Sequence, residues 1–268
     1  MSDIQDPKRK EEYLEQIRSY KPIHDTFMRN LFRNSTEVVE MVLRIILDKP
    51  DLKVTSSGTQ VDLIRLTGSR GLCLDVLATD STGKMYDIEV QRDISGAEPE
   101  RARFHASAMD VENSKRGMDF NQLPEVYVIF ITEKDFFGDN ESIYEFETLN
   151  TKKHFPLNDG RHILYVNGQY RSDTDIGKLM HDFNCSDPDE MLIPILAERT
   201  RYLKTDEKEV RFMCEQMERI RNEGKAESEA KTARNLKKIG MGDEEIAKIL
   251  ETDVNRVEEL LASGEKKN

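Results

Sequence analysis

The 268-residue sequence has no tryptophan and only three cysteines. Cys73, Cys185 and Cys214 are odd in number and far apart, and none belongs to a CxxC pair. This spacing indicates neither a disulfide framework nor a cysteine-rich zinc cluster. The three thiols are therefore expected to be reduced, and to be buried or incidental, as in a cytoplasmic protein.

Long apolar runs are also missing. No stretch reaches the ~20 apolar residues that a membrane-spanning helix needs. The best candidate, residues 38–47, is interrupted by Glu40 and Arg44. The first 20 residues contain no apolar core of signal-peptide length. These absences predict a cytoplasmic protein with no membrane partner.

Positive charge is in deficit, because 40 Lys and Arg face 52 Asp and Glu, for a net charge of −12. Proteins that coat nucleic acid in general are disfavoured by this balance, since phosphate binding depends on Lys and Arg. An enzyme that meets DNA through one local basic face stays open. An acidic metal site would itself add to the negative count.

Apolar periodicity predicts an α/β core of roughly 150 residues followed by a helical tail. Two helices are expected around Phe27 and over the stripe from Val38 to Leu47. Strands are then expected within residues 54–91, 125–137, 142–149 and 161–168. A helix from about Pro99 to before Gly117 crosses over between the first strands and the nearly continuous apolar strand EVYVIFITEKDFF. From about Asp173 the chain is helical, with a long polar helix over residues 206–238.

Two acids, Asp75 and Glu89, lie inside the two short apolar runs of LDVLATDSTGKMYDIEVQ, residues 74–91. Ser81-Thr82-Gly83 suits a three-residue hairpin loop with glycine in the left-handed position. Counting outward from this loop, Asp75 faces Glu89. Side chains alternate along a strand, so one face carries Cys73, Asp75, Leu77, Asp87, Glu89 and Gln91. The opposite face is uniformly apolar and is expected to be core.

Directly opposed carboxylates have Cβ atoms ~4.5–5.5 Å apart and repel each other. Without a partner, one of the two should have a raised pKa. A hard divalent cation such as Mg²⁺ would remove this conflict, and Gln91 could then orient water or a phosphate oxygen from the same face. In the alternative, Asp75 and Glu89 are solvent-facing residues of a half-exposed hairpin, paired with nearby Arg or Lys. The residues by themselves leave both alternatives open.

The run RGLCLDVLATDSTGKMYDIEVQRD, residues 70–93, resembles the PD-(D/E)XK nuclease-family transposases, also described as Rpn-type recombination-promoting nucleases. The resemblance implies a restriction-endonuclease-like α/β core, in which a central mixed sheet is flanked by helices, with a C-terminal helical tail. It assigns the Mg²⁺ ligands, with Mn²⁺ as a substitute, to Asp75 and Glu89. Gln91 takes the position of the lysine of the wider superfamily. Upstream, HDTFMRNLF is similar to the family's N-terminal helix and assigns its acid to Asp25.

The resemblance extends over residues 24–132, through the arginine-rich RARFHASAMD and the strand LPEVYVIFI. It implies a metal-dependent DNA endonuclease, a Mg-dependent deoxyribonuclease, that acts in recombination or transposition. The catalytic residues would be Asp75, Glu89, Gln91 and Asp25. Arg92, Arg101 and Arg103 would contact DNA phosphates, or would instead pair with neighbouring glutamates. His105 is expected to be a packed or surface residue.

Glutamine in place of lysine removes a positive charge that would help to polarise water. A degenerate nuclease fold that acts as an interaction or regulatory module is therefore the alternative function. The expected domains are a nuclease-like core over residues 20–172, a helical extension over 173–238 and a helix-turn-helix-like module over 239–268. The second helix of this module, VNRVEELL, offers one Arg and two Glu, which suits a DNA groove poorly. Its alternative role is docking, or homo-oligomerisation through the C-terminal helices.

Overall fold

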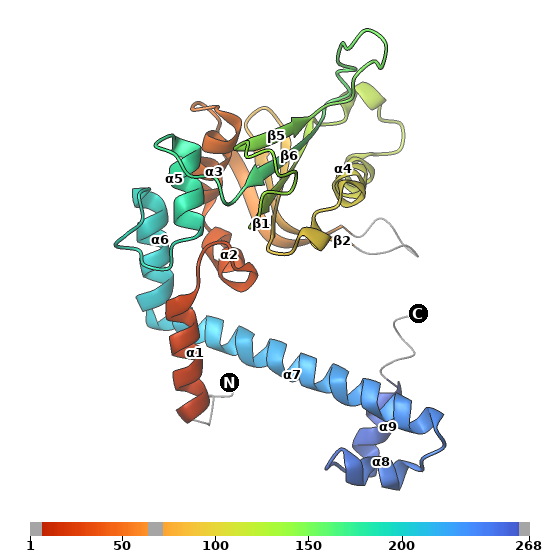
Figure 1. The fold of residues 1–268 in the computed structure, drawn as a ribbon. Coiled ribbons are helices and arrows are strands. Elements are labelled where there is room, and N and C mark those ends of the chain that lie inside the picture. The colour runs from red at the N-terminus through yellow and green to blue at the C-terminus, as the bar shows by residue number, and fades with distance from the viewer. Residues whose placement is uncertain (1–6, 64–71, 263–268) are drawn as a thin grey trace. The chain divides into compact units, whose positions relative to one another are not determined.

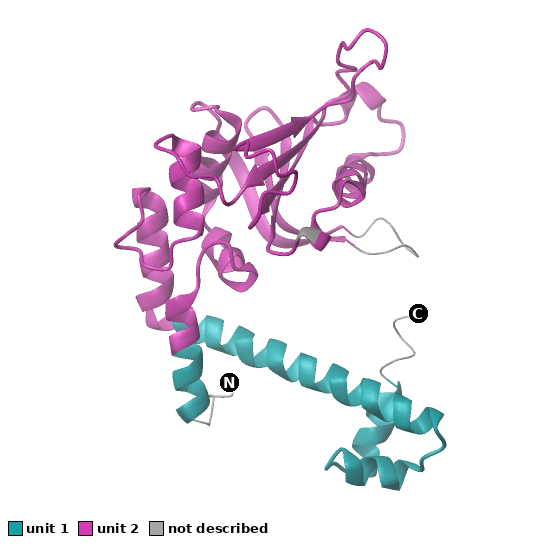
Figure 2. Cartoon of the chain, in the orientation of Figure 1, with its two compact units in different colours: residues 1–14, 210–268 teal, residues 15–209 magenta. Residues whose placement is uncertain are grey.

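The computed structural model describes residues 7–63 and 72–262 (Figure 1). These residues form two compact units (Figure 2). One unit consists of residues 15–209, and the other consists of the described residues up to Leu14 and from Val210 onward.

The larger unit is built on a six-stranded mixed sheet of order β1-β2-β3-β4-β6-β5. Strands β1, β2 and β3 are antiparallel, β3, β4 and β6 are parallel, and β5 pairs antiparallel with β6. The strands are β1 (Val54–Leu63), β2 (Leu72–Asp80), β3 (Met85–Gln91), β4 (Val126–Thr132), β5 (Ile143–Phe146) and β6 (Arg161–Asn167). The predicted α/β class with a central mixed sheet is confirmed.

Helices cover both faces of this sheet, with α4 on one face and α3 and α5 on the other (Figure 1). The helices of this unit include α2 (Asp25–Phe32), α3 (Thr36–Leu47), α4 (Pro99–Asn113), α5 (Asp175–Phe183) and α6 (Pro194–Thr205). A short 3₁₀ turn, η1 (Ile94–Gly96), precedes α4, and a second, η2 (Phe120–Gln122), follows it. Because both faces are covered, all seven residues of β4 are buried, as its continuous apolar run predicts.

Helix α4 is the crossover between the parallel strands β3 and β4, as predicted. Pro99 lies in its first turn, where a missing N–H costs nothing. Its buried face carries small side chains, among them Ala102 and Ala106, together with Met109. Alanines at these positions allow the helix to lie close to the sheet, directly over the predicted acidic face of the β2–β3 hairpin.

The β2–β3 hairpin has the predicted loop and register. Gly83 has a φ of +87°, and the Asp80 N–H donates to the Lys84 carbonyl at 3.0 Å. Leu77 pairs with Asp87. The Asp80 carboxylate holds the loop together by accepting hydrogen bonds from the Thr82 and Lys84 N–H groups and from the Tyr86 hydroxyl. Local loop chemistry therefore decides which side chains of the hairpin share a face.

Substituting Gly83→Ala is expected to destabilise the protein by about 1–2 kcal/mol, because a Cβ is disfavoured at positive φ even though nothing lies within 4 Å of it. Gly83→Asn should cost less, since asparagine tolerates the left-handed region. Urea unfolding of the two variants measures the difference. Equal losses would mean that the backbone conformation is not the cause.

The smaller unit contains a part of α1 (Pro7–Ser19), most of α7 (Glu207–Lys238) and the helices α8 (Asp243–Ile249) and α9 (Val254–Ala262). The Tyr13 hydroxyl donates to Glu218 at 2.8 Å, and Arg9 pairs with the same carboxylate at 3.1 Å. A small second core is formed by Ala230, Ala233, Ile246, Ala247, Val257 and Leu260. No helix in the described part of the chain combines the length and apolar character needed to cross a membrane.

Candidate active site

Strands β2 and β3 separate at the two predicted acids. Their pairing runs from Thr79↔Met85 to Val76↔Ile88 and stops there. Beyond that point β2 stays paired with β1, and β3 stays paired with β4 as far as Gln91. Asp75 and Glu89 would form the next pair in the same register. They therefore lie where β2 and β3 are no longer paired with each other, although β2 is still paired with β1 and β3 with β4.

The two carboxylates satisfy backbone groups that this opening leaves without a ladder partner. The Asp75 N–H donates to Glu89 Oε1 at 2.8 Å. The Val90 N–H donates in turn to the Asp75 carboxylate. Each acid thus accepts a donor from the other strand, which meets the need of buried backbone N–H groups for a partner.

The acidic face of the hairpin is buried under α4. Glu89 and Asp87 are 0% exposed and Asp75 is 8% exposed. The alternative in which Asp75 and Glu89 are solvent-facing residues of a half-exposed hairpin is therefore wrong. Buried charges need nearby compensation, and α4 and α2 provide part of it.

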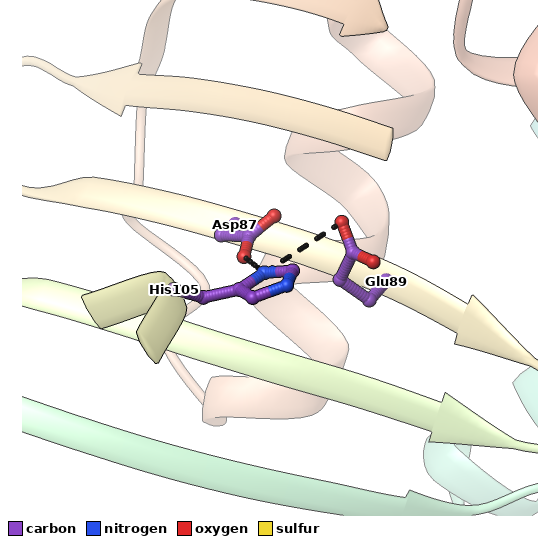
Figure 3. Close-up of side chains that lie close together, drawn as sticks. All are labelled: Asp87, Glu89 and His105. Carbon is purple, nitrogen blue, oxygen red and sulfur yellow. Dashed lines mark hydrogen bonds and ion pairs between the residues drawn. The ribbon is translucent and has the colours of Figure 1, made fainter. Parts of the chain in front are cut away.

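Two side chains of α4 reach the acids, and their i, i+4 spacing puts them on one face of the helix. Arg101 Nη2 donates to Glu89 Oε2 at 3.0 Å, and its Nη1 donates to the Gly96 carbonyl at 2.9 Å. The third guanidinium nitrogen, Nε, donates to His105 Nε2 at 3.2 Å. His105 Nδ1 lies 2.7 Å from Asp87 Oδ2 (Figure 3). Arg101 and His105 therefore connect the two acids of β3.

Two further elements meet Asp75 from the other side. On α2, Asp25 pairs with Arg29 at 2.9 Å, and Arg29 Nη2 lies 3.8 Å from Asp75 Oδ1. On β1, Gln60 stands opposite Asp75 and has a φ of +54°, which is rare for a residue other than glycine. Its Nε2 donates to Asp75 Oδ1 at 3.0 Å. Backbone strain of this kind gathers at functional sites, where it aims a side chain.

The protonation of the acids reflects their burial. Burial first, and then the charges of Asp87 and Asp75, raise the pKa of Glu89 to about 8. Burial and the charge of Asp25 raise the pKa of Asp75, and burial raises the pKa of Asp87 well above its ordinary value. Each carboxylate is therefore costly to ionise until more positive charge joins the cluster.

This cluster fits a divalent cation. One carboxylate oxygen each from Asp87 and Glu89 and one ring nitrogen of His105 lie within 4.8 Å of one another. Asp87 Oδ1 is buried and has no hydrogen-bond partner among the described residues. Carboxylate oxygens are the donors that Mg²⁺ and Mn²⁺ prefer. The donor set and the unmatched oxygen both suit an added cation.

The remaining predicted site residues are Gln91 and the three arginines expected to contact DNA. Gln91 is half-buried at the end of β3, and its Oε1 occupies space that a side chain at Gly96 would need. Arg92 is exposed and pairs with Glu133 at 3.1 Å. Arg103 is exposed on α4. Of the three predicted DNA-contacting arginines, Arg101 is the one that meets a predicted ligand.

Three residues of the cluster were not among the predicted site residues. Asp87 carries a sequence signal, since it alternates with Glu89 on the predicted acidic face. His105 takes the packed one of its two expected placements, but the partner of its ring is a carboxylate. Its spacing of four residues from Arg101 was the available signal. Gln60 has no such signal, because its contact depends on a backbone conformation that the sequence does not encode locally.

Comparison with known proteins gives one match. Residues 62–235 match the family model described as PD-(D/E)XK nuclease family transposase. The matched region contains β2, β3 and α4 with Asp75, Asp87, Glu89 and Arg101, whereas Asp25 and Gln60 precede it. No curated protein and no solved structure matches the chain.

Proposed function

Because the chain belongs to the PD-(D/E)XK nuclease family transposases, we propose that it is a metal-dependent endonuclease that hydrolyses phosphodiester bonds of DNA in recombination or transposition. One observation supports this activity above the others. Asp75 and Glu89 lie buried at an opening between two strands, with an arginine of α4 beside them. Buried acids with raised pKa values, set beside a positively charged side chain, are typical of functional sites.

The cation in this proposal is Mg²⁺, or Mn²⁺ in its place, and its ligands are Asp75 and Glu89. When bound, it supplies activation of water and neutralisation of the charge that develops on the phosphoryl group. The end of the β2–β3 pairing brings the two carboxylates together, and both are buried, Glu89 at 0% and Asp75 at 8% exposure.

The remaining roles follow from the contacts of each side chain. Arg101 touches Glu89 and has a side chain that is 37% exposed, so its guanidinium can reach both the buried acid and a phosphate outside. It brings to the site a positive charge that Gln91 lacks. Gln91 positions water or a phosphate oxygen, and Asp25 assists by holding Arg29 beside Asp75. The exposed Arg92 and Arg103 contact DNA phosphates further out.

We assign the nuclease core to residues 20–172, a helical extension to residues 173–238 and a docking or homo-oligomerisation module to residues 239–268. The α8–α9 pair supports this last role, since its second helix offers two glutamates and one arginine to any groove. Arg256 is moreover paired with Glu259 at 2.9 Å.

Relaxation of supercoiled plasmid tests the proposed activity. The wild-type protein is expected to nick or linearise DNA in Mg²⁺ or Mn²⁺ and to be inactive in EDTA, and Asp75→Ala and Glu89→Ala are expected to be inactive throughout. Asp189→Ala is a suitable control, because this acid is 80% exposed and lies outside the site. A wild type that neither cleaves nor binds either cation would instead support the degenerate fold that acts as an interaction or regulatory module.

Gly96→Ala is expected to lower the cleavage rate roughly tenfold or more, because the new methyl group overlaps Gln91 Oε1 and misplaces the carboxamide. In a Gln91→Ala background the same change should cost less than about twofold, since the overlap is gone. Single-turnover cleavage rates of the three variants measure this coupling. Equal losses in both backgrounds would assign the effect to Arg101, which donates to the Gly96 carbonyl.

A further inference from the structure

Asp87 is a fully buried acid of β3 that the proposed activity does not use. It is 0% exposed, and its Oδ2 is bound to His105. The other oxygen, Oδ1, meets no N–H or hydroxyl donor in the described part of the chain, and the Asp87 carboxyl faces the carboxyl of Glu89. A buried polar atom without a partner is costly, and an oxygen of a carboxylate especially so. The position of this buried oxygen beside Glu89 indicates a ligand, such as a cation, that compensates its charge.

The hydrogen bonds of His105 decide which of its nitrogens carries the proton. A guanidinium has donors only, so Arg101 Nε must donate and His105 Nε2 must accept. The ring proton is then on Nδ1, which donates to Asp87 Oδ2. A protonated Nδ1 has no lone pair to offer a cation. His105 is therefore a partner of Asp87 rather than a ligand, although its ring lies beside both acids (Figure 3).

The same contacts hold each acid by one oxygen. Arg101 binds Glu89 Oε2 and His105 binds Asp87 Oδ2. The two residues are alternate positions of β3, so their carboxylates project from one face. Figure 3 shows both side chains on the same side of the strand, with the imidazole between them. The arrangement fixes the orientation of both carboxylates while leaving Asp87 Oδ1 unmatched.

We propose that Asp87 is a third carboxylate ligand of the cation site, acting through Oδ1, and that His105 and Arg101 are positioning residues for it and for Glu89. This inference rests on the proposed function only in requiring that the site binds a divalent cation. It adds to the proposed ligands an acid that lies on the same face of β3 as Glu89, with one carboxylate oxygen within 4.8 Å of a Glu89 oxygen. Outer partners that orient ligands in this way typically change metal affinity 10–100-fold when they are removed.

Calorimetric titration of the full chain with MnCl₂ tests the proposal without measuring cleavage. Asp87→Asn keeps the shape of the side chain and an oxygen that accepts from His105, but it loses the charge. Its Mn²⁺ affinity is expected to fall at least about tenfold, while its melting temperature without metal stays unchanged or rises. A purely structural aspartate would show the reverse, a lower melting temperature at unchanged affinity.

Asp80→Asn is the matched control, because it removes one charge from the same hairpin at the loop end, where Asp80 binds Thr82, Lys84 and Tyr86. This variant should lose stability and keep its Mn²⁺ affinity. His105 offers a second, independent pair. The amide of His105→Asn can still donate to Asp87 and should keep the affinity within about threefold, whereas His105→Leu should weaken it about tenfold or more.

The outcomes separate this inference from the proposed function. A wild type that binds no Mn²⁺ overturns both. A wild type that binds Mn²⁺, loses it in Glu89→Gln and keeps it in Asp87→Asn overturns the role of Asp87 alone. If Asp87→Asn does not fold, equal affinities of His105→Asn and His105→Leu overturn it in the same way.

Discussion

Glu89→Gln is expected to reduce cleavage at least about 10³-fold and, at the same time, to raise the stability of the metal-free protein at pH 8. The loss of activity follows because the amide keeps the hydrogen-bonding shape but not the charge that holds a cation and stabilises the reacting phosphate. The gain in stability follows from burial, since Glu89 is 0% exposed beside Asp87 and Asp75.

The pH dependence of this gain has a definite sign. The pKa of Glu89 rises from its ordinary 4.5 to about 8 on folding, so the folded state binds more protons than the unfolded state between these values. The contribution of Glu89 to stability is therefore lost as the pH rises from about 4.5 to 8. Glu89→Gln has no such proton, so the variant should gain on the wild type progressively across that window.

Thermal melts in EDTA at pH 6 and pH 8, together with single-turnover cleavage, measure both effects. Glu125→Gln is a suitable control, because the neighbouring Lys84 lowers the pKa of this partly exposed acid instead of raising it. A Glu89→Gln protein that melts below the wild type at pH 8 would contradict the expectation. It would mean that the Arg101 ion pair stabilises the fold by more than the burial of Glu89 costs.

Asp182→Ala is expected to lower the free energy of unfolding by about 3–5 kcal/mol, because it removes a buried carboxylate that holds two backbone donors. Asp182 is 0% exposed at the end of α5. Its two oxygens each accept a backbone N–H, from Leu192 and Ile193 at 2.8 Å, just before Pro194 begins α6. Charge-assisted hydrogen bonds of this kind contribute about 1.5–3 kcal/mol each.

Urea unfolding of three variants checks this expectation. Asp182→Asn retains one acceptor and should lose less than Asp182→Ala. Asp189→Ala should lose under about 1 kcal/mol, because Asp189 is 80% exposed and its pair with Arg201 lies on the surface. If Asp182→Ala and Asp189→Ala were equally stable, the start of α6 would not depend on the buried carboxylate.

The placement of α6 matters for the acidic site as well as for stability. Arg199 of α6 donates to the carbonyl groups of Asn30, Leu31 and Arg33 at 2.6–3.2 Å, and so supplies donors to the C-terminal end of α2. Helix α2 carries the Asp25–Arg29 pair that faces Asp75. Hydrogen bonds between side chains and backbone groups thus connect the buried Asp182, through α6 and α2, to the Asp25–Arg29 pair beside Asp75.

The hairpin and its family could be predicted from the sequence because both depend on local chemistry. Ser81-Thr82-Gly83 defines the loop, the loop defines the register, and the register places Asp75 beside Glu89. The family resemblance read from the same residues is confirmed by the match over residues 62–235. The crossover helix and the buried strand β4 followed from periodicity in the same way.

The burial of the acids and the identity of the residues around them could not be predicted, because both depend on contacts between segments that are distant in the sequence. The acidic face is polar by sequence, and only the close approach of α4 through Ala102 and Ala106 buries it. The role of His105 depends on that same approach. The end of the pairing between β2 and β3 and the positive φ of Gln60 have no signal in the local sequence pattern.

The pairing of α1 with α7 has a consequence for the order in which the chain is made. Tyr13 and its partner Glu218 are 205 positions apart. At ribosomal rates of roughly 5–20 residues per second, Tyr13 emerges about 10–40 s before the residue that accepts its hydrogen bond. Residues 15–209 are synthesised within that interval. The nascent chain therefore carries Tyr13 without its hydrogen-bond partner until the strands and helices of the larger unit have all been synthesised.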